Sequence, residues 1–203
     1  MASDVDLCNR ALTLLGASAR ITTIGENSAN GQLCQLLYDP TRLSVLAAHP
    51  WNFAKRRAVL TRLSATPPFK WSYYYEMPVG YVRVIGVYAD GDCYVQMTEY
   101  AEEAYEESGT QTKRVIATSA EAVYLEYVAD TQASRDVNQM PVLFRDALVT
   151  KLAADMAVEK TEHLNKADLL NAKFERIIAQ ARSQDTMNDP PEMIPWGPAI
   201  DAR

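Results

Sequence analysis

The sequence has few of the residues that enzyme and metal sites usually require. Its two histidines are His49 and His163, and its three cysteines, Cys8, Cys34 and Cys93, match no zinc or redox spacing. With only eight glycines it has no glycine-rich phosphate loop, and it lacks CxxC, HExxH and GxSxG motifs. We therefore predict no catalytic, metal-binding or cofactor-binding residue, and we expect the cysteines to be free, buried thiols.

Long apolar runs and an excess of positive charge are also missing. No stretch approaches the roughly 20 apolar residues of a membrane span. Residues 1–6 carry neither the basic segment nor the apolar core of a signal peptide, so we expect none. The net charge of −6 argues against a protein that coats DNA through a basic surface. With 203 residues, 48% of them hydrophobic, the chain can bury a core of its own.

Helical periodicity is found towards both ends of the chain. Ser3 with Asp6 three residues later is a capping-box pattern that predicts a helix start. Pro40 interrupts the second apolar stripe without shifting its phase, which predicts one kinked helix. The predicted helices cover residues 3–15, 28–48, a segment beginning at Pro141, and 165–183.

The middle of the chain alternates apolar and polar residues and is rich in aromatic side chains. We predict strands over residues 53–63, 71–75, 81–88, 93–97, 113–118 and 122–128. Residues 89–92 resemble a hairpin turn, and the last two strands are expected to form a further hairpin. Residues 98–107 hold five glutamates and predict a solvated face or loop, with a metal site as a weaker alternative. Residues 130–138 read as a polar connection.

This layout predicts an α+β protein. A bundle of four main helices would carry an inserted β-rich domain between helices 2 and 3, followed by an extended C-terminal tail. The expected bounds are 1–50 and 135–187 for the helical bundle, 51–134 for the β domain, and 188–203 for the Pro-rich tail. The bundle is expected because the apolar faces of the flanking helices can be buried only against each other.

The helical pattern of the first part of the chain gives way to the alternating strand pattern at five residues: His49, Pro50, Trp51, Asn52 and Phe53. Pro50 lacks a backbone donor and restrains the residue before it, so the preceding helix should end there. In an extended chain Trp51 and Phe53 lie on one face and can pin the first strand against the helices. We interpret the segment as a structural hinge that sets the angle between the bundle and the β domain.

The tail contains four of the ten prolines and too little apolar surface to fold alone. Its apolar side chains predict a partner-docking segment with Trp196 as the anchor, although packing on its own domain or disorder would suit the composition equally well. The candidate docking residues are Met193, Ile194, Trp196 and Ile200.

Several segments together carry a resemblance to a known family. They are residues 7–16 (LCNRALTLLG), Ile21, Cys34, residues 38–42 (YDPTR), 46–54 (LAAHPWNFA), 71–84, 125–128 (LEYV) and 144–157. In this order they resemble the tail tubular protein A family, the head-to-tail adaptor proteins of short-tailed bacteriophages. The acidic residues 99–107 and the Pro-rich tail depart from the family pattern.

The resemblance implies a structural virion protein of the phage neck and tail, assembled in the bacterial cytoplasm, and not an enzyme. Its copies are expected to form a ring, a dodecamer, that joins the portal protein to the tail nozzle, a tail tubular protein B-like protein. The ring would continue the DNA channel, with double-stranded DNA passing through without specific binding and with no membrane contact. An acidic protein suits such a channel because like charges prevent sticking.

Two other functions stay open at this stage. One is a cell-wall hydrolase of the phage tail, which would cleave peptidoglycan or another glycan with an Asp/Glu pair. The other is a nucleic-acid-binding module that uses a basic patch formed by Lys55, Arg56, Arg57 and Arg62.

Overall fold

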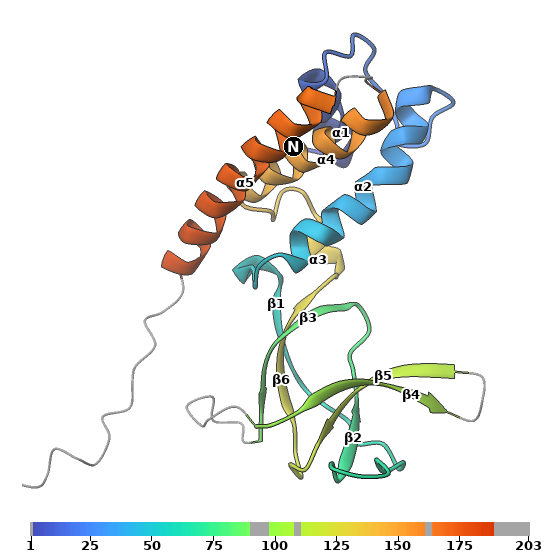
Figure 1. Ribbon diagram of the computed structural model, residues 1–203, viewed down its shortest axis with the longest axis vertical. Coiled ribbons are helices and arrows are strands. Elements are labelled where there is room, and N and C mark those ends of the chain that lie inside the picture. The colour runs from blue at the N-terminus through green and yellow to red at the C-terminus, as the bar shows by residue number, and fades with distance from the viewer. Residues whose placement is uncertain (1, 90–97, 108–110, 161–163, 189–203) are drawn as a thin grey trace, which may run out of the picture. The chain divides into compact units, whose positions relative to one another are not determined.

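The computed structural model describes residues 2–89, 98–107, 111–160 and 164–188 (Figure 1). The chain divides into two compact units. The helical unit comprises Met1–Lys55 and Val128–Thr186, and the strand unit comprises Arg56–Tyr127 with the residues that follow Thr186. Outside the described residues lie Cys93, His163, the predicted strand at 93–97, and the predicted docking residues Met193, Ile194, Trp196 and Ile200.

The helices begin where local sequence signals place them. Ser3 caps the first helix: its hydroxyl accepts from the Asp6 N–H at 3.2 Å, and the Asp6 carboxylate accepts from the Ser3 N–H at 2.8 Å. Pro40 lies inside a single continuous helix, as predicted. The described helices are α1 (Asp4–Leu14), α2 (Ala29–Ala47), α3 (Gln132–Arg135), α4 (Val142–Lys160) and α5 (Leu164–Met187), with a 3-10 turn η1 at Asn52–Ala54.

The core of the helical unit surrounds α4. Both α1 and α2 pack against α4, whereas α1 and α2 make few contacts with each other. The α5 helix meets the others through long side chains: Lys166 donates to the Leu15 carbonyl at 2.8 Å, and the Lys151 ammonium lies 5.9 Å from the centre of the Phe174 ring. Cys8 and Cys34 form no disulfide and are fully buried, as predicted. Among the described helices, none is long and apolar enough to cross a membrane.

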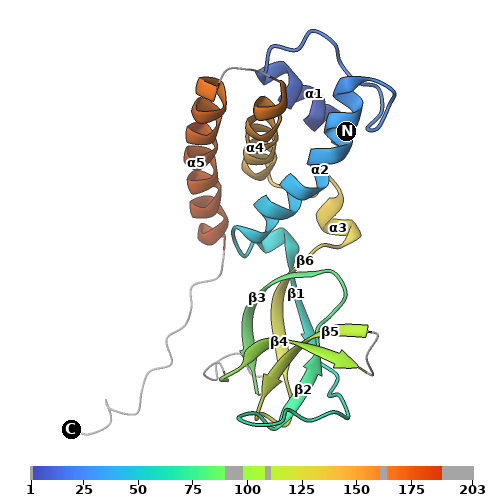
Figure 2. The same ribbon diagram turned by 45° about the vertical axis from the view of Figure 1, so that its right-hand side comes forward.

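Six described strands form two antiparallel sheets of three strands each, in the orders β1-β6-β3 and β2-β5-β4. Tyr75 lies opposite Ile116 on β5, and Glu103 of β4 lies opposite Val115. The strands are β1 (Lys55–Val59), β2 (Tyr73–Glu76), β3 (Tyr81–Tyr88), β4 (Ala101–Glu107), β5 (Gln111–Thr118) and β6 (Tyr124–Ala129) (Figures 1 and 2).

The predicted fold class is wrong in its architecture. The protein is α+β, but its helices do not form a four-helix bundle with an inserted β domain. The first reason is that α1 and α2 pack separately on α4 instead of completing a ring of helices around one core. The second is that the strands build two small sheets, where the sequence suggested one continuous β insertion.

One local prediction in the middle of the chain also fails, and two others are met only in part. The strands at 113–118 and 122–128 do not form a hairpin, because β5 pairs with β2 and β4 while β6 lies between β1 and β3. The acidic residues 101–107 form strand β4, although its Glu102 and Glu106 side chains are solvated as expected. The polar connection at 130–138 contains the short helix α3.

Candidate functional site

The predicted hinge segment contributes to the core of the helical unit. Trp51 is only 1% exposed, and its indole Nε1 donates to the Val45 carbonyl at 3.0 Å. The edge-to-face contacts of its ring are with Phe144, at a centroid distance of 5.0 Å, and with His49, at 4.8 Å. Such pairs add to the free energy gained from burying the rings.

The backbone conformation of this segment differs from the predicted one. Trp51 and Phe53 do not lie along an extended strand, because the 3-10 turn Asn52–Ala54 follows Trp51 directly. Phe53 nevertheless reaches Phe144, with ring centroids 4.9 Å apart. The two aromatic residues therefore share one partner on α4, a later helix, whereas the prediction placed them against the preceding helices by way of an extended strand. Their role in setting an angle stays a prediction.

A nearly buried carboxylate holds the same segment from the other side. Asp185, near the end of α5, accepts from the Asn52 N–H at 3.0 Å and lies 3.3 Å from His49 Nε2. Asn52 Nδ2 also donates to the Asp185 carbonyl at 2.8 Å. Burial lowers the pKa of His49, although the Asp185 carboxylate acts in the opposite direction. The sequence singled out His49 and Asn52 but not Asp185.

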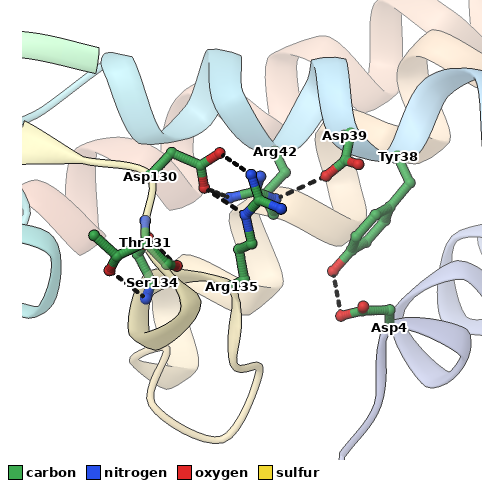
Figure 3. Close-up of polar contacts among 8 residues, drawn as sticks. All are labelled: Asp4, Tyr38, Asp39, Arg42, Asp130, Thr131, Ser134 and Arg135. Atoms are coloured by element: carbon green, nitrogen blue, oxygen red, sulfur yellow. Dashed lines mark hydrogen bonds and ion pairs between the residues drawn. The ribbon is translucent and has the colours of Figure 1, made fainter. Parts of the chain in front are cut away.

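A second cluster consists of the charged groups that surround the buried Arg42 of α2 (Figure 3). The Arg42 side chain is 2% exposed, and its Nη1 donates to Asp130 at 2.9 Å. Asp130 also accepts from Arg135 Nη2 at 2.7 Å, and Arg42 Nε donates to Asp39 at 3.2 Å. Burial by itself would raise the pKa of Asp130, but the hydrogen bonds from Arg135 and Arg42 outweigh it, so the pKa is lowered. The cluster ties α2 to the segment that leads into α3.

Local sequence signals for this cluster exist but were missed. The hydroxyl of Thr131 accepts from the Ser134 N–H at 3.4 Å, and the Ser134 hydroxyl accepts from the Thr131 N–H at 2.7 Å. This reciprocal cap is what starts α3 and places Arg135 beside Asp130. Nearby, the Tyr38 hydroxyl donates to Asp4 at 2.7 Å, and burial, helped by that carboxylate, raises the pKa of Tyr38 (Figure 3).

Two residues of the predicted basic patch interact with other side chains of the protein. Arg57 Nε and Nη2 both donate to Glu126 Oε1 at 3.1 Å. The Arg62 guanidinium lies 3.6 Å from the centre of the Tyr73 ring. Both side chains thus already have partners within the strand unit, which weakens the case for a phosphate-binding surface.

A pocket of about 410 Å³ opens on the helical unit. At its rim Arg10 Nη2 and Asp146 Oδ1 form an ion pair at 2.6 Å. The hydroxyls of Thr13 and Thr150 donate to backbone carbonyls one helical turn earlier, so they are engaged in their own helices. The other lining residues are Leu14, Val149, Lys173 and Ile177.

The part of the chain that the structure describes holds no group of three His, Cys, Asp or Glu residues that could bind a metal ion. The clusters around Trp51 and Arg42 both lie in the helical unit, and the interactions within them are aromatic packing, hydrogen bonds and charge pairing. Comparison of the chain with protein-family models and with curated proteins gives no match.

Proposed function

We propose that the chain is a structural virion protein, a head-to-tail adaptor of a short-tailed bacteriophage. Its copies form a ring that joins the portal to the tail nozzle and continues the DNA channel. The proposal starts from the ordered resemblance in the sequence, which spans most of the chain. A structural protein needs packed faces and no reaction chemistry, and the described clusters are of that kind.

One observation carries the proposal: the segments of the resemblance contact one another in the helical unit. Three of them converge on residues 144–157 of α4. Arg10 pairs with Asp146 at 2.6 Å, the Thr41 hydroxyl donates to Asp155 at 2.9 Å, and Trp51 packs on Phe144. These segments therefore belong to one packed unit, which is the arrangement expected if they form a common framework.

The charge of the protein supports the role in DNA passage. The net charge is −6, and two of the cations proposed for nucleic-acid binding are engaged within the chain. An acidic lumen repels the phosphate backbone and lets DNA slide without forming the many Lys and Arg contacts that hold it. A basic lumen in an electron cryomicroscopy map of the ring would exclude this part of the proposal.

Co-sedimentation with portal rings tests the proposal. The purified chain is mixed with the portal protein encoded by the same phage genome and centrifuged through a sucrose cushion. We expect the chain to sediment with the portal and not alone, and the variant lacking residues 188–203 to bind less. Failure of the full chain to sediment with the portal would reject the adaptor role. Undiminished binding of the shortened chain would reject only the docking role of the tail.

A further inference from the structure

One end of the sheet β2-β5-β4 is a strand whose charged residues are all acidic. β4 has β5 as its strand neighbour, and no other strand of the described residues pairs with it. Its Glu102 and Glu106 side chains are exposed on one face, and Glu103 lies on the opposite face. Figures 1 and 2 show β4 and β5 running side by side as a hairpin. The outer edge of such a strand carries unpaired backbone donors and acceptors that can bind another strand.

The other sheet ends in a strand with the opposite charge. β1 pairs with β6, and it has no second strand neighbour within the described ranges. Its charged residues are all basic: Lys55, Arg56 and Arg57. The Arg57 side chain is still 79% exposed while it pairs with Glu126, so its outer side stays accessible. Of the four end strands of the described sheets, β4 thus carries the most acidic residues and β1 the most basic ones.

Charge decides which strands can be neighbours. Two copies of β4 side by side would place glutamates opposite glutamates, and like charges directly opposite are destabilising. The charges of β1 and β4 are complementary on both faces of a sheet that the two strands would form together. Arg57 lies on one face of β1 and Arg56 on the other, while β4 offers Glu102 and Glu106 on one face and Glu103 on the other. Either choice of face therefore brings unlike charges together.

We propose that β4 of one copy adds to the edge of β1 in a neighbouring copy. The contact is heterologous, because each copy gives its acidic strand to one neighbour and its basic strand to the other. Contacts of this type generate closed rings when the rotation between copies is right. Main-chain hydrogen bonds supply the affinity, and the charges specify the partner strand. The inference rests on the proposed ring and names the surfaces that build it.

A disulfide trap tests the contact directly. In a Cys93→Ser background, one sample of protein carries Ala104→Cys on β4 and a second carries Val59→Cys on β1. The two are mixed, oxidised with copper phenanthroline and separated without reductant, both free and on portal rings. We expect disulfide-linked heterodimers to exceed the homodimers of either protein alone. Ala58→Cys replaces Val59→Cys in a parallel mixture, so both faces of β1 are sampled.

Charge reversal provides the specificity control. Glu102→Lys with Glu106→Lys in the β4 protein should reduce the heterodimer about tenfold, because these side chains then carry the same charge as the face of β1 that they meet. Charge reversal on that face alone should restore it: Lys55→Glu with Arg57→Glu in the Val59→Cys protein, and Arg56→Glu in the Ala58→Cys protein. Glu121→Lys, an exposed acid outside β4, should change nothing.

Two results would overturn the strand pairing. One is absence of heterodimer from both mixtures, in the free protein and on portal rings. The other is a heterodimer that is insensitive to charge reversal. Neither result touches portal binding by the chain, which is measured separately and decides the proposed function.

Discussion

Asn52 and Asp185 are joined by hydrogen bonds from both the backbone and the side chain of Asn52, although they are 133 residues apart in the sequence. The backbone N–H of Asn52 donates to the Asp185 carboxylate at 3.0 Å, and its side-chain amide donates to the Asp185 carbonyl at 2.8 Å. This pair fixes the end of α5 to the turn that follows Trp51. The segment between α2 and β1 is therefore held from two sides, by Phe144 of α4 and by Asp185 of α5.

Replacing Asp185 by Ala tests the carboxylate without removing the second bond, which uses the backbone carbonyl. We expect the free energy of unfolding to fall by about 1–3 kcal/mol, because the Asn52 N–H is left without its acceptor. Urea denaturation followed by tryptophan fluorescence measures the change. Asp168→Ala, at an exposed position of the same helix, should stay within about 0.5 kcal/mol of the parent protein. Equal effects of the two substitutions would contradict the role of Asp185.

The protein should lose stability as the pH falls below the ordinary pKa of histidine. Burial lowers the pKa of His49 in the folded state from 6.5. Between that value and the lowered one, the unfolded chain binds a proton that the folded chain does not, so acid favours unfolding. His49→Gln should flatten the dependence between about pH 7 and pH 5.5, whereas His163→Gln should leave the His49 contribution in place. A steeper loss of stability in His49→Gln than in the parent would contradict this assignment.

Trp51→Ala should destabilise the helical unit by about 3–5 kcal/mol, the usual cost of removing a large buried aromatic side chain. Trp51→Phe should cost less, because it keeps a ring against Phe144 and loses only part of the buried volume together with the hydrogen bond to the Val45 carbonyl. Chemical denaturation followed by circular dichroism compares the variants. If Trp51→Ala left both folding and assembly intact, the interpretation of this segment as a structural hinge would be wrong.

The cluster around Arg42 should respond unequally to loss of its partners. Asp130→Ala removes the nearly buried carboxylate partner of Arg42 and leaves only the exposed Asp39, which should cost about 3–5 kcal/mol. Arg135→Ala removes a side chain that is 54% exposed and should cost no more than about 1 kcal/mol. Thermal unfolding of both variants gives the ranking, and a larger effect for Arg135 would argue against the central role of Arg42.

Local signals predicted the helices well and the sheets poorly, for a physical reason. The capping box at Ser3 and the strand at 81–88 depend on neighbouring residues, and the structure confirms both. Strand partners depend on contacts between distant segments, which no local pattern encodes. The few residues between β5 and β6 suggested a tight hairpin, yet they connect two sheets. Without the correct pairing, the bundle with one inserted β domain was the simplest arrangement, and it was wrong.

The same distinction between local patterns and distant contacts explains which residues of the candidate site the sequence could predict. Trp51 and Phe53 stood out because aromatic residues at a change of period are visible in the sequence. Asp185 did not, because its partner Asn52 belongs to another segment and an isolated acid on a helix suggests a solvated position. The short helix α3 escaped because four residues are too few for a periodic pattern, although the Thr131 and Ser134 pair was a usable signal.

The mass of the protein, measured by light scattering alone and with portal rings, tests the adaptor proposal most directly. We expect a monomer alone, because a ring that closed before meeting the portal would be unproductive. With portal rings we expect one complex that contains many copies of the chain, consistent with twelve. A mass for the mixture equal to that of the separate components, or the same large assembly with and without portal, would contradict the account.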